Sequence, residues 1–124
     1  DYVVIDCEAG MEHVSRQTTR DIDILLIVSD PTIRGIIAAS RMKPLIKEVR
    51  THVGQIWLIV NRVEGELPEE IARAIRENDL DLLASIPRDP NLAPLEIKGE
   101  PAIRLPEDSP LRRGAREIVK KLGL

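Results

Sequence analysis

Short runs of apolar residues recur along the chain and predict its strands. They cover residues 2–5, 24–28, 56–60 and 81–86. Three of the four runs are continuous rather than alternating, which is typical of strands that are buried on both faces of a parallel sheet. The pattern therefore predicts four short strands separated by longer segments.

Residues that start or interrupt helices lie between these runs. Thr32 is a suitable N-cap for a helix that begins at Ile33, and Pro44 is expected to kink or divide that helix. Pro68 and Pro110 occupy first-turn positions of two further helices, where the missing N–H of proline costs no hydrogen bond. Strands that alternate with helices predict an α/β fold: a doubly wound, mainly parallel sheet with flanking helices.

The last helical segment, residues 111–124, has an apolar side and a basic side. Its apolar positions predict the face that packs on the core: Leu111, Ala115, Ile118, Val119 and Leu122. The basic side is interpreted as solvated rather than as a membrane-binding face, and no apolar run approaches the roughly 18 residues of a membrane span. No membrane contact is expected.

Polar residues follow each of the first three runs: Asp6, then Ser29 and Asp30, then Asn61 and Arg62. In an open α/β sheet the carboxyl ends of the strands form the crevice that binds ligands. These side chains therefore predict a site at that edge of the sheet. The alternative is that they are polar only because loops are solvated.

Asp6 is followed four residues later by Gly10, a combination that suits nucleotide chemistry. The carboxylate of Asp6 can hold a water molecule of Mg²⁺, and a glycine lets a backbone N–H approach a phosphate without a Cβ in the way. The alternative is an aspartate that caps the next turn, with Gly10 at its bend.

Composition narrows the class of protein. The chain has 124 residues, 43% of them apolar and 31% charged, with one cysteine and a net charge of −3. This length suits one domain, residues 1–124, and the apolar content excludes a disordered chain. The single cysteine excludes a disulfide framework within the chain and is typical of the reducing cytoplasm. The acidic balance and the scarcity of aromatic residues argue against a nucleic-acid partner.

Together, these motifs resemble those of the deviant Walker A ATPases of the MinD/ParA class. Residues 1–13 resemble their switch II region, and the Glu-Ala-Gly-x-Glu-His run within it is most similar to the ATPases that help to mature nickel carbon monoxide dehydrogenase. Three further motifs follow in the order of the family, at residues 28–32, 60–63 and 86–90. The resemblance implies a partial P-loop NTPase fold and a site for ATP or ADP with Mg²⁺.

The resemblance also implies a role for each residue of that site. Asp6 would hold Mg²⁺ through a water molecule and Gly10 would sense the γ-phosphate. Asn61 would recognise the adenine edge, because its amide can donate and accept hydrogen bonds at once. A loop would cover the adenine and ribose, formed by Pro87, Arg88 and Asp89.

Switch II residues of this family respond to the bound nucleotide. By this resemblance Glu8, Glu12 and His13 would act as switch residues, and His13 would transmit the nucleotide state to a partner. A homodimer and a client metalloenzyme are the partners that the resemblance implies. A surface position on a helix is the alternative for His13.

Asn61 has two other interpretations. It can be a residue at a strand end that satisfies a loop carbonyl, without any ligand. The sequence from Asn61 to Glu64 also resembles the guanine-reading Asn-Lys-x-Asp motif. Glu64 stands in place of the aspartate, and its longer side chain would misplace the carboxylate, so adenine is favoured.

The phosphate-binding loop of the family is the main departure. No Gly-x-x-x-x-Gly-Lys-Ser/Thr motif occurs in the 124 residues. In the family this loop lies upstream of switch II and cradles the triphosphate with backbone N–H groups and lysines. We therefore expect the chain to be the C-terminal portion of a single ATPase domain, without hydrolytic activity by itself and with no catalytic residue of its own.

A second consequence of the resemblance concerns the sheet. The strand that precedes the phosphate-binding loop lies, in the family, between the strands expected at residues 2–5 and 24–28. Without it, the middle of the sheet becomes an open edge that carries Val3, Ile5, Leu25 and Ile27. An open apolar edge recruits another strand, so the 124 residues are expected to associate, unless the sheet rearranges to close the gap.

Two alternative functions are left open by the sequence. The chain is a non-catalytic, doubly wound binding or scaffold module in the first. In the second it belongs to a partitioning or cell-division ATPase of the same class, which needs a DNA or membrane contact that the charge and the last helix support poorly.

Overall fold

A computed structural model describes residues 1–7, 21–48 and 52–124. The expected alternation of strands and helices is present from residue 21 onward. In chain order the elements are β1 (Asp21–Ser29), α2 (Ile33–Ser40), α3 (Met42–Glu48), β2 (His52–Val63), α4 (Glu69–Glu77), β3 (Leu82–Pro87), α5 (Leu92–Ile97), the 3₁₀ helix η1 (Ala102–Arg104) and α6 (Pro110–Leu122).

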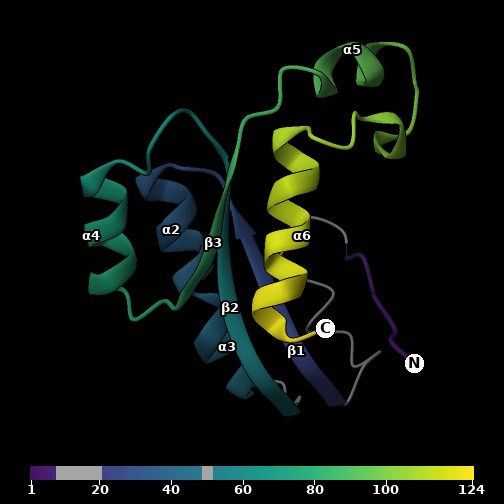
Figure 1. Cartoon of the computed structure of the whole chain (residues 1–124). Coiled ribbons are helices and arrows are strands. Elements are labelled where there is room, and N and C mark those ends of the chain that lie inside the picture. The colour runs from purple at the N-terminus through teal and green to yellow at the C-terminus, as the bar shows by residue number, and fades with distance from the viewer. Residues whose placement is uncertain (8–20, 49–51) are drawn as a thin grey trace.

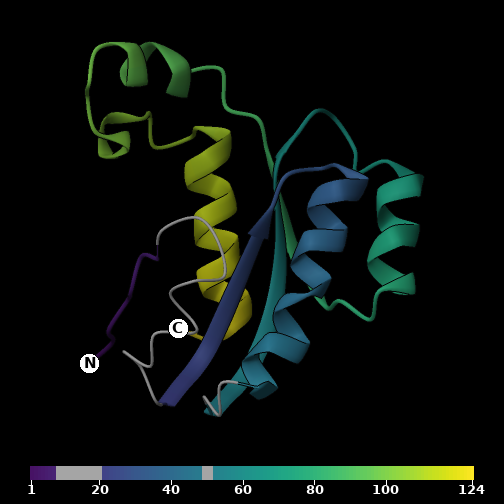
Figure 2. The same ribbon diagram turned by 180° about the vertical axis from the view of Figure 1, so that it is seen from behind.

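The sheet is parallel, with the strand order β1-β2-β3. Leu25 pairs with Ile56 across the first ladder, and Val60 pairs with Ser85 across the second. Helices α2, α3 and α4 cover one face of this sheet and α6 covers the other (Figures 1 and 2). The predicted α/β class, with a parallel sheet between flanking helices, is confirmed.

The central strand β2 supplies side chains to a hydrophobic core on each face of the sheet. Leu58 and Val60, both almost completely buried, pack with Ile36 of α2 in the larger core. Ile59 points the opposite way and packs with Ile118 of α6. Alternation along a strand explains this division, because successive side chains point to opposite faces.

Helix boundaries follow the capping residues closely, with one exception. Thr32 caps α2 by accepting a hydrogen bond from Gly35 N at 3.0 Å, and Ser109 caps α6 in the same way. The break expected at Pro44 occurs earlier, at Arg41, between α2 and α3. Pro44 lies in the first turn of α3, where a proline lacks no intrahelical hydrogen bond and is tolerated.

The strand predicted at residues 2–5 is wrong. These residues belong to no strand, and their side chains are between 60% and 92% exposed. Residues 1–7 lie on the α6 side of the sheet (Figures 1 and 2). A strand exists only when a neighbour completes its ladder of hydrogen bonds, and β1, the next strand along the chain, pairs with β2 alone among the described residues.

Strand β1 therefore has one free edge within the described part of the chain. Leu25 and Ile27, expected on an open edge, lie on this strand, and their side chains pack beneath α2 in the larger core. The exposed apolar side chains of β1 are Leu26 and Val28, on the opposite face, which α6 leaves uncovered because it packs mainly on β3. The expected association through this edge stays a prediction.

The core-facing side of α6 also differs in part from the expected one. Ile118 is buried and Leu111 is partly buried against the core as predicted, but Val119 is 48% exposed. Gly114, which was not expected on this face, is buried. The helix approaches β3 so closely there that a Cβ on Gly114 would lie 3.1 Å from Ile86 Cγ2. Among the described residues, no helix is long and apolar enough to cross a membrane.

Replacing Gly114 by leucine is predicted to destabilise the protein by about 1–3 kcal/mol, because the added side chain has no room against Ile86. Urea denaturation followed by circular dichroism measures the change. Ala115→Leu is the matched control, since its neighbouring position is exposed. Equal stabilities of the two variants would contradict the close approach of α6 to β3.

Candidate functional site

The loops that follow β2 and β3 border an open cavity of about 490 Å³ at the carboxyl ends of the strands. This is the edge at which open α/β sheets bind their ligands. Its wall consists of residues from both loops and from the start of α5: Val63, Glu64, Gly65, Pro87, Arg88, Asp89, Pro90 and Ala93.

One wall of the cavity comes from the end of β2. Asn61 and Arg62 were expected to follow the strand, but β2 continues to Val63 through an irregularity in its ladder. Arg62 has a positive φ of 59°, and its backbone N–H donates to Oδ1 of Asn61 at 2.9 Å. Among the described residues, no hydrogen bond joins the amide NH₂ of Asn61 to an acceptor.

The opposite wall begins at Pro87, the last residue of β3, whose register partner is Val63. Beyond the ladder, the backbone N–H of Arg88 donates to the carbonyl of Val63 at 2.9 Å. This hydrogen bond holds the two loops together where they leave the sheet. The cavity is thus built on paired backbone rather than on two independent loops.

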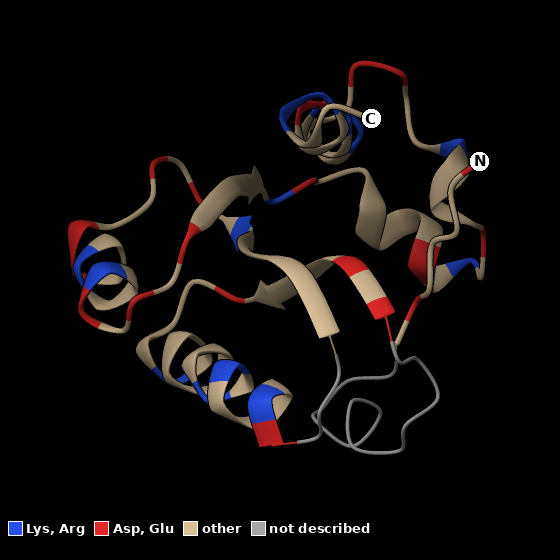
Figure 3. Cartoon of the chain, turned by 90° about the horizontal axis from the view of Figure 1, so that it is seen from below, with Lys and Arg blue, Asp and Glu red and all other residues tan. Residues whose placement is uncertain are grey.

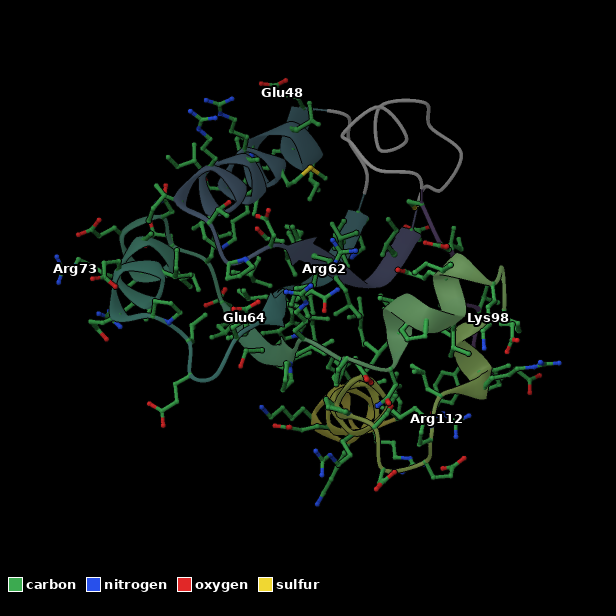
Figure 4. The ribbon with its side chains drawn as sticks, turned by 90° about the horizontal axis from the view of Figure 1, so that it is seen from above. Glu48, Arg62, Glu64, Arg73, Lys98 and Arg112 are labelled. Atoms are coloured by element: carbon green, nitrogen blue, oxygen red, sulfur yellow. The ribbon has the colours of Figure 1, made fainter. Side chains whose placement is uncertain are left out.

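An ion pair joins the side chains of the two walls. Nη1 of Arg88 lies 2.8 Å from Oε1 of Glu64, and both side chains are largely exposed. Figure 4 shows Glu64 with Arg62 above the strand ends, well apart from Arg73 on α4 and from Lys98 after α5. This ion pair was not predicted from the sequence. A signal for it was present, because an acidic residue directly follows β2 and a basic residue directly follows its neighbour β3.

Asp89 is buried and its carboxylate is occupied by hydrogen bonds within the protein. Oδ1 accepts from the backbone N of Asn91 at 2.9 Å and from its side chain at 3.1 Å, and Oδ2 accepts from the backbone N of Leu111 at 3.1 Å. Burial alone would raise the pKa of Asp89, but these bonds and one from Ser109 outweigh it, so the pKa lies below its ordinary value. Asp89 thereby ties the cavity wall to the N-terminus of α6.

The end of β1 forms a separate, tightly packed turn. The hydroxyl of Thr32 donates to the carboxylate of Asp30 at 2.8 Å, and the hydroxyl of Ser29 donates to the carbonyl of Asp30 at 3.0 Å. A Cβ on Gly35 would collide with Oδ1 of Asp30 and lie 2.5 Å from Oγ of Ser29, so a larger residue at this place in the first turn of α2 would displace these side chains from the turn. The polar side chains after β1 hence serve the cap of α2.

Of the residues expected in a nucleotide site, the structure brings four together at the cavity or beside it: Asn61, Pro87, Arg88 and Asp89. Asp6 is exposed, and the segment of residues 1–7 that carries it lies on the α6 side of the sheet (Figures 1 and 3). The other expected residues lie outside the described part of the chain: Glu8, Gly10, Glu12 and His13.

Another open cavity, of about 350 Å³, lies between the amino ends of β1 and β2. It is lined by Asp21, Asp23 and His52 among others. Residues 1–7, 21–48 and 52–124 contain no group of three or more acidic, histidine or cysteine side chains placed to hold a metal ion. The polar residues predicted to form a site that lie in the sheet, Ser29, Asn61 and Arg62, are at the carboxyl ends of the strands, away from this cavity.

Comparison with known proteins places this geometry in a family. No protein-family model matches the chain. The chain is 34% identical over 122 residues to an uncharacterised ATP-binding protein of Methanocaldococcus jannaschii, a match that covers 98% of this chain and 48% of that protein. It is 32% identical over 108 residues to the septum site-determining protein MinD of Synechocystis, covering 83% of this chain and 40% of that protein. The homologues of this chain are ATP-binding proteins of the MinD/ParA family.

A third relative is the carbon monoxide dehydrogenase accessory protein CooC of Rhodospirillum rubrum, 34% identical over 88 residues, which is 70% of this chain and 32% of that protein. The MinD cell division protein of Aquifex aeolicus superimposes on the fold with a TM-score of 0.64 at 24% identity, over 82% of this chain and 44% of that one. The ParA family ATPase of Chlorobium tepidum does so with a TM-score of 0.58 at 22% identity, over 81% and 40%.

The resemblance to the MinD/ParA class is confirmed by these relatives. The chain spans about half the length, or less, of the curated relatives that it matches. The match to the first relative covers 98% of this chain, so it includes the two loops that form the cavity.

Replacing Asp89 by asparagine is predicted to lower the free energy of unfolding by about 1–3 kcal/mol at pH 7. The amide has one acceptor atom instead of two, so either Asn91 or Leu111 loses its partner in a buried setting. Urea denaturation measures the loss. Asp108→Asn, at an exposed position of the loop that precedes α6, is the control and should change stability little.

The pH dependence of this loss follows from the direction of the pKa shift. Because the folded state lowers the pKa of Asp89, its stabilising contribution is fully present above the ordinary aspartate pKa and is lost as the pH falls through the folded value. The difference in stability between wild type and Asp89→Asn should therefore shrink below about pH 4. Glu69 and Glu107, whose pKa values arginines lower, are common to both proteins and cancel. A difference that is the same at pH 3 and pH 7 would contradict this assignment.

Proposed function

We propose that this chain is the ATP-binding portion of a MinD/ParA-like nucleotide-switch ATPase. The cavity at the carboxyl ends of β2 and β3 would receive the adenine and ribose. The observation that carries the proposal is that the segment from Pro87 to Asp89 lines this cavity beside the end of β2, the neighbouring strand that carries Asn61, 26 residues before Pro87. ATP-binding relatives match nearly the whole chain and support it.

The chemistry of the cavity suits a purine base. Its volume lies in the range of small-molecule sites, and the exposed residues Pro87, Pro90 and Ala93 offer apolar surface to the faces of the ring. The NH₂ of Asn61 would donate to a ring nitrogen of adenine, while its Oδ1, which already accepts from Arg62, would accept from the exocyclic amine through its second lone pair.

The triphosphate and Mg²⁺ would depend on residues outside this cavity. We propose that Asp6 holds Mg²⁺ through a water molecule and that Gly10 senses the γ-phosphate, with Glu8, Glu12 and His13 coupling the nucleotide state to a partner. The 124 residues contain no phosphate-binding motif. The chain is therefore proposed to be the C-terminal portion of one ATPase domain and to hydrolyse no ATP by itself.

The proposed biological role is maturation of a metalloenzyme in the cytoplasm, by a homodimer that acts on a client protein. The Glu-Ala-Gly-x-Glu-His run and the CooC relative support this role. The MinD relatives favour the second candidate, a cell-division ATPase. Binding of the purified protein to a metalloenzyme client in its metal-free form would favour the first, and binding to acidic lipid vesicles would favour the second.

Replacing Asn61 by alanine is predicted to weaken binding of AMP by roughly 1–3 kcal/mol, because the base would lose its hydrogen bonds to the amide. AMP is the probe because it presents the base and ribose without requiring a phosphate-binding loop. NMR titration measures the affinity. Asn78→Ala is the control, since that side chain bonds within α4. Equal competition by ATP and GTP for the wild-type site would show the adenine-reading role to be wrong.

A second prediction concerns Asp6 and needs the protein joined to its phosphate-binding loop. Asp6→Ala should leave ATP binding largely intact and reduce the rate of hydrolysis, because a ligand that acts on Mg²⁺ through water mainly stabilises the charge of the transition state. Steady-state phosphate release and nucleotide affinity are the two measurements. Normal turnover in this variant would refute the switch II assignment.

A further inference from the structure

The carboxylate of Glu64 lies in the wall of the base cavity, three residues after Asn61. The polypeptide between the two residues turns sharply, since Arg62 adopts a positive φ and Val63 is held by the backbone of Arg88. A free carboxylate on this wall would face any base that enters the cavity.

A free carboxylate in the cavity would bind one purine base more strongly than the other. Ionised glutamate only accepts hydrogen bonds. Guanine carries a ring N–H and an exocyclic NH₂ side by side, which together suit one carboxylate, whereas adenine presents an unprotonated ring nitrogen at the same place. An unpaired Glu64 would therefore favour guanine and oppose adenine.

The structure shows that this carboxylate is not unpaired. The guanidinium of Arg88, from the opposite wall, lies 2.8 Å from it. The two side chains are close because the backbone brings them together. Val63 and Pro87 are paired as the last residues of their strands, and Glu64 and Arg88 are the residues that follow them. Arg88 thus both neutralises Glu64 and occupies an oxygen that would otherwise accept from a base.

We propose that the Glu64–Arg88 pair determines the base specificity of this site, with Arg88 withholding from the nucleotide a carboxylate that would select guanine. The proposal rests on the proposed function, since it requires a purine in this cavity. It assigns to Arg88 a role through Glu64, besides any contact of its own with the nucleotide.

The test compares the affinities of AMP and GMP, measured by NMR titration of the wild-type chain and of its variants. Arg88→Gln should lower the ratio of the GMP to the AMP dissociation constant by about two- to fivefold, the range expected for an exposed ion pair. Arg88→Lys, which keeps the charge, should restore the wild-type ratio. Arg62→Gln is the matched control, because it removes a neighbouring positive charge that does not pair with Glu64.

The double variant Arg88→Gln with Glu64→Gln separates this role from a simple loss of contact. If Glu64 causes the shift, the ratio returns to the wild-type value when its charge is also removed. A ratio that stays the same in Arg88→Gln, or a shift that persists in the double variant, would overturn the specificity role while leaving ATP binding in place. Failure of the wild-type chain to bind AMP would instead refute the proposed function, and the inference with it.

Discussion

Burial of β2 on both of its faces is the constraint on which the rest of the structure depends. Its successive residues Leu58, Ile59 and Val60 point alternately to the α2–α4 side and to the α6 side, so one strand joins two cores. Because β2 also pairs with β1 and β3, it fixes the register of both neighbours. The place where it ends is therefore the most rigidly determined part of the carboxyl edge.

The cavity takes its shape from that rigidity. The hydrogen bond from Arg88 N to the carbonyl of Val63 continues the β2–β3 pairing past the regular ladder, so the two walls cannot separate without disturbing the sheet. On the far side, the buried carboxylate of Asp89 fastens the same loop to the first turn of α6. The walls are thus held by the backbone and by a buried carboxylate, and an exposed ion pair such as Glu64–Arg88 adds little to the stability of the fold. The role that we propose for this pair is in base specificity.

Much of this arrangement was accessible from sequence. Continuous apolar runs predicted three of the strands, Thr32 and Pro110 marked two helix starts, and the family resemblance implied that the residues from Pro87 to Asp89 share a site with Asn61. These features depend on local chemistry or on the parallel direction of the strands. The segment at residues 2–5 carries the same apolar signal but forms no strand, because pairing requires a neighbour that no local pattern supplies.

The sequence by itself determined the α/β class, the resemblance to the MinD/ParA class and the residue types that meet at the cavity. Apolar runs, helix caps and short motifs each span only a few residues, so they can be identified without the structure. Only the tertiary structure decided which partners those residues have. The close approach at Gly114, the occupied carboxylate of Asp89 and the pairing of Glu64 with Arg88 all join elements distant in sequence. Each depends on how near two backbones come when the core is packed, and that distance is set by all the side chains between them.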